Sequence, residues 1–210
     1  FSIITFSSNY LFWLEEGEYF TLENNLKPFL HTWSLSIEIQ FYLFFPILLF
    51  FLTKNDKYKI RIIILLFILS FSISNILSFY NKDAAFYLSV TRVWEILGGA
   101  LSYFILRQSE SKNNYSEFIS LVSILGIIFS IILFKDNTFH PGILTMIPIF
   151  STVVLIIFCE KTKYIRKLLE NNIICGLGKI SYSLYIIHFP VLAILGYLEI
   201  NLGNLDKFLF

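Results

Sequence analysis

Residues 31–42 read HTWSLSIEIQFY and lead directly into an apolar run that continues to Leu52. The stretch places His31, Glu38 and Gln40 in the opening turns of what otherwise reads as a membrane-spanning helix. An ionisable side chain inside a membrane segment is costly and rare, so Glu38 marks a candidate functional site. The stretch therefore predicts both a transmembrane fold and the place where its chemistry occurs.

The composition of the chain agrees with a membrane location. Of its 210 residues, 56% are hydrophobic and 19% aromatic, only 15% are charged, and the mean hydropathy is +0.71. A soluble domain of this length cannot bury so much apolar surface. A net charge of +1 without basic tracts argues against nucleic acid as a partner. Cys159 and Cys175 lie in or beside apolar runs without metal-ligand neighbours, so we interpret both as small apolar residues.

Six segments are apolar and long enough to span a bilayer, which takes about 20 residues per helix. They cover residues 32–53, 60–80, 86–106, 117–134, 142–159 and 176–198, and residues 1–14 resemble the end of a seventh. None shows the alternation of a barrel strand, so we expect helices. Without linkers or repeats, residues 1–210 are predicted to form one all-α, polytopic membrane domain. Because the chain begins at Phe1 within an apolar segment, we expect it to be a fragment.

The Lys and Arg residues predict how the helices are oriented. Ten of the sixteen lie in the loops 53–61, 107–116 and 160–175, whereas residues 15–30 are acidic. Basic loops remain in the cytoplasm, so the alternate loops face outward. With a rise of 1.5 Å per residue, Glu38, Arg92, Glu95 and His188 then lie roughly 9 to 15 Å below the outer helix ends. We expect these four side chains to share one outward-facing cavity.

On the helix expected over 32–53, His31, Ser34 and Glu38 share one face, with Tyr42 a turn further. A carboxylate near a hydroxyl or an imidazole is equipped for proton transfer. In the structural alternative, His31 and Trp33 anchor the helix at the membrane interface and Glu38 pairs with an arginine.

Arg92 and Glu95 are three residues apart and can pair on one helix face, although Arg92 can also reach across to Glu38. Such a pair lets two charges enter the membrane at low cost. In the functional interpretation, Arg92 binds a carbonyl, a carboxylate or a phosphate. Gly98 and Gly99 follow and permit close helix packing.

In the helix expected over 176–198, Ser181, Tyr185 and His188 line one face, and Pro190 is expected to interrupt the helix. Such a stripe either contacts substrate or bonds to neighbouring helices. His140, in the sequence FHPG, is expected only to shape a turn. Phosphate-loop, dinucleotide, HExxH and GxSxG motifs are absent from the sequence, and no metal site is predicted.

Four stretches resemble the signature blocks of the membrane acyltransferase family 3, the integral-membrane O-acetyltransferases of cell-surface glycans. They are LHTWSLSIEIQFYLFFP, AAFYLSVTRVWEILGGAL, FHPGILTMIPIFSTVVLII and LGKISYSLYIIHFPVL, in the family's order and spacing. The residues at the family's signature positions are His31, Trp33, Ser34, Glu38, Gln40, Tyr42, Arg92, Glu95, Ser181, Tyr182 and His188. Ile39 stands where the family usually has a second glutamate.

The resemblance implies an enzyme of the bacterial inner membrane that moves an acetyl group from acetyl-CoA to a hydroxyl of an exported polysaccharide. It implies no tightly bound cofactor. We expect Glu38, His31, Arg92 and Glu95 to be catalytic. The residues expected to bind substrate are Trp33, Ser34, Gln40, Tyr42, Ser181, Tyr182, Tyr185 and His188.

The resemblance also implies parts of the protein beyond this chain. The family's first helices, with the histidine usually regarded as the base, would precede Phe1. An extracytoplasmic SGNH-like domain would follow in the full-length protein, and the isolated chain is expected to be inactive. Two other classes stay open, namely a transporter or flippase of a glycan or lipid-linked precursor and an inactive membrane scaffold. The inverted repeats typical of transporters are not evident in the sequence.

Overall fold

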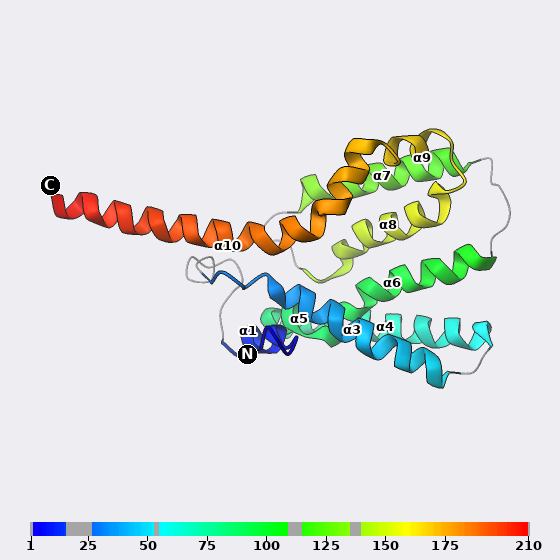
Figure 1. The fold of residues 1–210 in the computed structure, drawn as a ribbon. Coiled ribbons are helices and arrows are strands. Elements are labelled where there is room, and N and C mark those ends of the chain that lie inside the picture. Colours follow the sequence, from blue (N-terminus) through cyan, green and yellow to red (C-terminus); the bar gives the residue numbers. More distant parts are fainter. Residues whose placement is uncertain (1, 16–26, 53–54, 109–114, 135–139, 210) are drawn as a thin grey trace.

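The computed structural model describes residues 2–15, 27–52, 55–108, 115–134 and 140–209 (Figure 1). The regular elements in these ranges are all helical, which confirms the predicted all-α fold class. They are α1 (Ser8–Leu14), α3 (Thr32–Phe51), α4 (Asp56–Tyr80), α5 (Lys82–Tyr87), α6 (Ser89–Gln108), α7 (Ser116–Leu133), η1 (Ile143–Thr145), α8 (Met146–Cys159), α9 (Tyr164–Leu169) and α10 (Asn172–Leu209). Several charges used for the topology prediction lie outside the described residues: Glu16, Glu18, Glu23, Lys54, Lys112 and Lys135.

Four helices are long and apolar enough to cross a membrane, by length and composition: α3, α4, α7 and the part of α10 over Asn172–Leu198. Two of the six expected spans differ. Helix α6 has the length of a span, but Arg92, Glu95 and Arg107 make it more polar. Helix α8 has 14 residues and reaches only 17 with η1, the lower limit for a straight crossing. The protein is a multi-pass membrane protein whose least apolar long helix carries the predicted charged pair.

The helices turn polar faces inward and apolar faces outward. On α4 the buried side chains are Ile63, Ser70, Ser74 and Ser78, while large apolar side chains such as Phe79 are exposed. On α7 all four buried residues are serines. Small residues let helix backbones approach closely, and serine side chains can form hydrogen bonds between helices. The large apolar side chains on the outer faces contact lipid. This pattern explains how so apolar a chain can leave most of its large side chains on the surface.

Helices α3, α4 and α6 enclose an apolar core at the end of the bundle that holds the loop from α3 to α4. Phe41, Ile63, Leu97 and Phe104 are buried there. A second cluster, with Phe12, Leu30 and Tyr87, ties α1 and α5 to the start of α3. Helices α7 and α8 pack on each other, and α8 also packs on α6. The first cluster packs α3 against α4 and α6, and the second holds the N-terminal end of α3.

Helix α10 differs from the expected final span. It continues through Pro190 without a break, so the prediction that this proline interrupts the helix is wrong. Figure 1 shows α10 starting beside α7 and α9 and extending past the other helices towards the C-terminus. It contacts the start of α3 through Tyr185, His188 and Phe189.

Gly126 marks a close approach between α7 and α8. A Cβ atom built there would lie 2.3 Å from Ser151 Oγ and 3.3 Å from Ser151 Cβ. We therefore expect Gly126→Ala to destabilise the protein by about 1–3 kcal/mol, because the helices must move apart. Gly99→Ala is the matched control, since a Cβ atom there meets nothing within 4 Å. Denaturant unfolding in detergent measures both, and equal midpoints for the two variants would contradict the packing described.

Candidate functional site

The two ends of the bundle have different chemistry. At one end, Arg107 pairs with Asp56 at 3.4 Å, and Glu117 accepts hydrogen bonds from the backbone N–H groups of Lys163 and Tyr164. That end carries the basic loops. The polar residues singled out in the sequence cluster at the opposite end, where α3, α6 and α8 begin and α4 finishes.

The start of α6 is held in place from two sides. Asn81 caps α5, its Oδ1 accepting from Ala84 N–H at 2.9 Å, and Thr91 Oγ1 lies 2.8 Å from the carbonyl oxygen of Ala85. From α4, Ser70 Oγ donates to the carbonyl of Val90 at 2.6 Å and accepts from Trp94 N–H at 3.1 Å. Because these bonds lie on either side of Arg92 in the sequence, its backbone is fixed.

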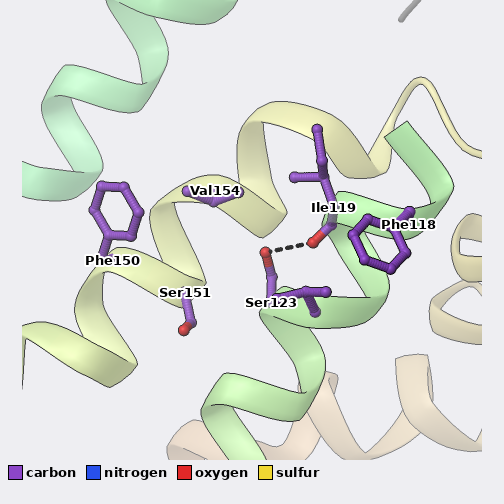
Figure 2. A pocket seen from close by; sticks show the side chains of 7 residues that line it. Phe118, Ile119, Ser123, Phe150, Ser151 and Val154 are labelled. Carbon is purple, nitrogen blue, oxygen red and sulfur yellow. Dashed lines mark hydrogen bonds between the residues drawn. The ribbon is translucent and has the colours of Figure 1, made fainter. Parts of the chain in front are cut away.

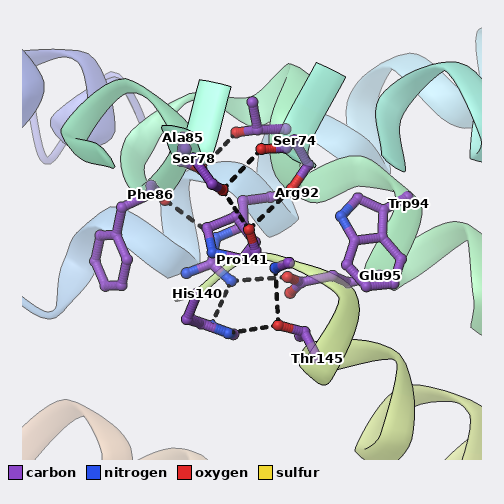
Figure 3. Close-up of polar contacts among 12 residues, drawn as sticks. Ser74, Ser78, Ala85, Phe86, Arg92, Trp94, Glu95, His140, Pro141 and Thr145 are labelled. Atoms are coloured by element: carbon purple, nitrogen blue, oxygen red, sulfur yellow. Dashed lines mark hydrogen bonds and ion pairs between the residues drawn. The ribbon is translucent and has the colours of Figure 1, made fainter. Parts of the chain in front are cut away.

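Arg92, Glu95, His140 and Thr145 form what we call the arginine cluster (Figure 3). Arg92 Nη1 lies 2.7 Å from Glu95 Oε1 and 2.7 Å from His140 Nε2, and Arg92 Nε donates to the carbonyl of Phe86 at 3.1 Å. The Arg92 side chain is only 6% exposed and the Glu95 side chain 25%. The expected Arg92–Glu95 pair therefore forms, and Arg92 does not pair with Glu38.

Two aromatic rings that contact each other, Trp33 and Phe86, lie together against the guanidinium. The Arg92 Cζ atom is 5.1 Å from the ring centroid of Trp33 and 4.9 Å from that of Phe86. Both distances are within the range of cation–π attraction. Trp33, predicted to bind substrate or anchor the helix, is thus part of the wall around Arg92.

His140 is the residue that the sequence interpretation missed, and the expectation that it only shapes a turn is wrong. Arginine has no acceptor, so the contact makes His140 Nε2 the acceptor and places the proton on Nδ1. Nδ1 then donates to Thr145 Oγ1 at 2.8 Å. Burial and, secondly, the Arg92 charge lower the pKa of His140 to about 3. At neutral pH this imidazole is therefore uncharged.

His31, Ser34, Tyr185 and His188 form a second group, the histidine cluster. Tyr185 Oη donates to the carbonyl of His31 at 2.5 Å and lies 2.5 Å from Ser34 Oγ. The His31 ring is 5.2 Å from the Tyr185 ring and 5.3 Å from the His188 ring, between centroids. The structure thus brings together four of the predicted residues from α10 and the start of α3.

The imidazole of His31 is buried. The residue is 3% exposed, and among the described residues neither ring nitrogen has a hydrogen-bond partner. Its ring stacks on Phe189 with centroids 5.4 Å apart. A buried polar group without a partner costs stability, so its presence at a cluster of polar residues is typical of a functional site.

Gln40 belongs to a hydrogen-bond network that joins α1 to α3 and α6. Its Nε2 donates to the carbonyl of Phe6 at 2.8 Å and to Asn9 Oδ1 at 3.0 Å, and its Oε1 accepts from Ser89 Oγ. Asn9 in turn donates to the carbonyl of Tyr87 at 3.1 Å. These contacts give Gln40 a packing role in addition to the binding role predicted for it.

The remaining predicted residues lie apart from both clusters. Glu38 is exposed on α3 and makes no ion pair or hydrogen bond within the described part of the chain. Tyr42 and Tyr182 are 63% and 62% exposed, and Ser181 bonds only to the carbonyl of Gly178 within its own helix. The single cavity expected to hold Glu38 with Arg92, Glu95 and His188 is therefore replaced by two clusters, with Glu38 in neither.

A groove of about 200 Å³ between α7 and α8 lacks ionisable side chains (Figure 2). It is lined by Phe118, Ile119, Val122, Ser123, Phe150, Ser151 and Val154. Within the described ranges, no three His, Cys, Asp or Glu side chains come close enough together to hold a metal ion. Among the described residues, the arginine and histidine clusters are thus the candidates for a functional site.

Comparison with known proteins gives consistent matches. A family model described as "Acyltransferase domain" matches residues 1–210. A Staphylococcus aureus (strain COL) protein named "Putative O-acetyltransferase" is 28% identical over 204 residues, which is 90% of this chain and 34% of that protein. The O-acetyltransferase OatA of Staphylococcus aureus (strain NCTC 8325) is 27% identical over 202 residues, or 90% of this chain and 33% of its own length. The chain thus spans about a third of these relatives. No solved structure matches it significantly.

Proposed function

Since the chain belongs to the acyltransferase family 3, we propose that its full-length protein is a membrane O-acetyltransferase of the bacterial cytoplasmic membrane. Acetyl-CoA is the proposed donor, and a hydroxyl of an exported or cell-surface polysaccharide is the proposed acceptor. Residues 1–210 contribute part of one membrane domain, and an SGNH-like domain is a proposed partner within the whole protein. The names of the relatives support O-acetyl transfer.

The observation that carries the proposal is the arginine cluster. Arg92 and Glu95 neutralise each other and His140 is uncharged, so the cluster has no net charge. A neutral site that offers N–H donors suits a carbonyl oxygen better than a phosphate, whose charge would need an excess of positive groups. In acyl transfer, negative charge develops on that carbonyl oxygen, and Arg92 is placed to stabilise it.

The histidine cluster provides a candidate for proton transfer. As the acceptor hydroxyl attacks the acetyl carbon, His31 takes its proton; the carbon–sulfur bond then breaks and the proton goes to the departing thiolate. Ser34, Tyr185 and His188 offer hydrogen bonds to the acceptor sugar, and Trp33 offers an aromatic face. The histidine that the resemblance places before Phe1 is the second candidate for the base. The role of Tyr182 rests on the resemblance alone, and those of Tyr42 and Ser181 rest on the resemblance and on their helix faces.

The test of the function uses the full-length protein in a bacterial strain that lacks its own copy of the gene. Mass spectrometry of the surface polysaccharide measures base-labile acetyl groups. The wild-type protein should add them, whereas a transporter or a scaffold would leave the acetyl content unchanged. A polysaccharide without added acetyl groups, despite normal protein abundance, contradicts the proposal.

Glu38 is proposed to orient the histidine that the resemblance places before Phe1, or to share its proton. Replacing Glu38 with glutamine should therefore lower acetylation at least about tenfold, because the amide does not take up a proton. Glu170→Gln is the matched control, since Glu170 forms an exposed pair with Arg166 at the basic end. Undiminished acetylation by the Glu38 variant would remove Glu38 from the mechanism while leaving the enzyme class intact.

A further inference from the structure

The hydrogen bonds of Arg92 leave one edge of its guanidinium unused. Nε bonds to Phe86, and the two N–H groups of Nη1 are directed to Glu95 and His140. Within the described residues, Nη2 has no partner. It is also not among the described side-chain atoms that are both fully buried and unpartnered. Its two N–H groups are thus the donors left for a bound oxygen atom.

The segment that carries His140 is anchored to the helix that also fixes Arg92. The carbonyl of Pro141 accepts hydrogen bonds from Ser78 Oγ at 2.5 Å and from Ser74 Oγ at 3.4 Å (Figure 3). Ser70, one turn before Ser74 on the same buried face of α4, holds the backbone on both sides of Arg92. One row of serines therefore sets the distance between His140 and the guanidinium.

Resting on the function proposed above, we infer that His140 is a positioning residue for Arg92. Its neutral ring accepts from Nη1, while its Nδ1–H group is held by Thr145. Phe86 holds Nε and Glu95 holds one N–H of Nη1, so without His140 the second N–H of Nη1 is left unheld. With His140 as a second acceptor the plane is fixed, and Nη2 stays directed at the acyl carbonyl.

Two substitutions separate positioning from simple packing. Glutamine at position 140 reproduces both contacts, because its Oε1 accepts from Arg92 and its Nε2 donates to Thr145. Leucine fills a similar volume and makes neither bond. We expect His140→Gln to keep the rate within about threefold of wild type and His140→Leu to lower it about 10- to 100-fold, as for a misdirected donor. The loss should be in kcat more than in KM for acetyl-CoA, because the contact is strongest in the transition state.

The deciding experiment is a double-mutant cycle in membranes that contain the full-length protein. Isotopically labelled acetyl-CoA serves as the donor, and label in base-labile groups of the surface polysaccharide gives the initial rate. The four proteins are wild type, His140→Leu, Arg92→Lys and the double variant. If His140 acts through Arg92, the double variant should lie within about threefold of Arg92→Lys alone, because coupled effects are not additive.

Each outcome has a separate meaning. Wild-type membranes without transfer would contradict the proposed function and not the role of His140. Active wild type with multiplicative losses in the double variant, or with His140→Gln as impaired as His140→Leu, would overturn the positioning role. Thermal unfolding of each purified variant in detergent reports whether a loss of rate follows a loss of fold.

Discussion

Replacing Arg92 with lysine should reduce acetyl transfer by about 100-fold, the loss expected when a donor to a developing oxyanion is removed. Lysine keeps the positive charge but loses the planar fork that lets one side chain bond to Phe86, Glu95 and His140 at once. A flexible ammonium group cannot satisfy these acceptors and a substrate carbonyl in the same geometry. The measurement is the O-acetyl content of the surface polysaccharide at matched protein abundance.

Arg107→Lys is the control for this prediction. Arg107 lies on the same helix, its side chain is 63% exposed, and it pairs with Asp56 at the opposite end of the bundle. Exposed pairs contribute little to stability, so this variant should keep wild-type activity. Equal activity of the two variants would mean that Arg92 supplies only charge. The proposed fork geometry would then be wrong.

Replacing His31 with leucine should stabilise the protein and nearly abolish its activity. Within the described ranges both nitrogens of the His31 ring are buried without hydrogen-bond partners, and leucine fills a similar space without polar atoms. Removing an unsatisfied buried group gains about 1–3 kcal/mol. Losing a group that transfers a proton costs about 10²- to 10⁴-fold in rate. A variant that unfolds at higher temperature but transfers no acetyl groups would show both effects.

His188→Leu provides the matched control, because His188 is exposed and its Nδ1 lies 2.7 Å from the carbonyl of Tyr185 in its own helix. It should show no comparable gain in stability. If His31→Leu retains more than about a third of wild-type activity, proton transfer belongs to the other candidate base. A lower unfolding temperature for His31→Leu would show that the imidazole is satisfied in the whole protein.

The sequence predicted the elements of this fold well, because membrane helices follow from local composition. The expected spans 60–80 and 117–134 correspond to α4 over Asp56–Tyr80 and α7 over Ser116–Leu133. The expected break at Pro190 does not occur, because a proline in a membrane helix is often accommodated without ending it. Lengths were harder to predict, since α8 is shorter than a full crossing and tertiary contacts decide where it begins.

The sequence predicts residues of the candidate site, but it leaves open whether Arg92 pairs with Glu95 or with Glu38. The cost of burying charge singles out Arg92 and Glu95, and the structure pairs them. The choice between Glu95 and Glu38 as the partner of Arg92 depends on how α3 and α6 are rotated. Sequence periodicity does not fix that rotation. His140 escaped notice because it precedes a proline in a loop, 48 positions from Arg92. The regular spacing of Ser70, Ser74 and Ser78 was the available signal for a polar face on α4.

The Arg92–Glu95 ion pair lies within one helix, three positions apart, and this bears on how the protein enters the membrane. Each charge brings its own counter-charge, so the part of α6 before Arg107 can be inserted as an electrically neutral segment before any neighbour arrives. A pair between α3 and α6 would leave both helices charged until they met. His140 and the serines of α4 are then needed only at the later step, when inserted helices associate. Insertion of α6 into the membrane and formation of the arginine cluster are therefore separate steps.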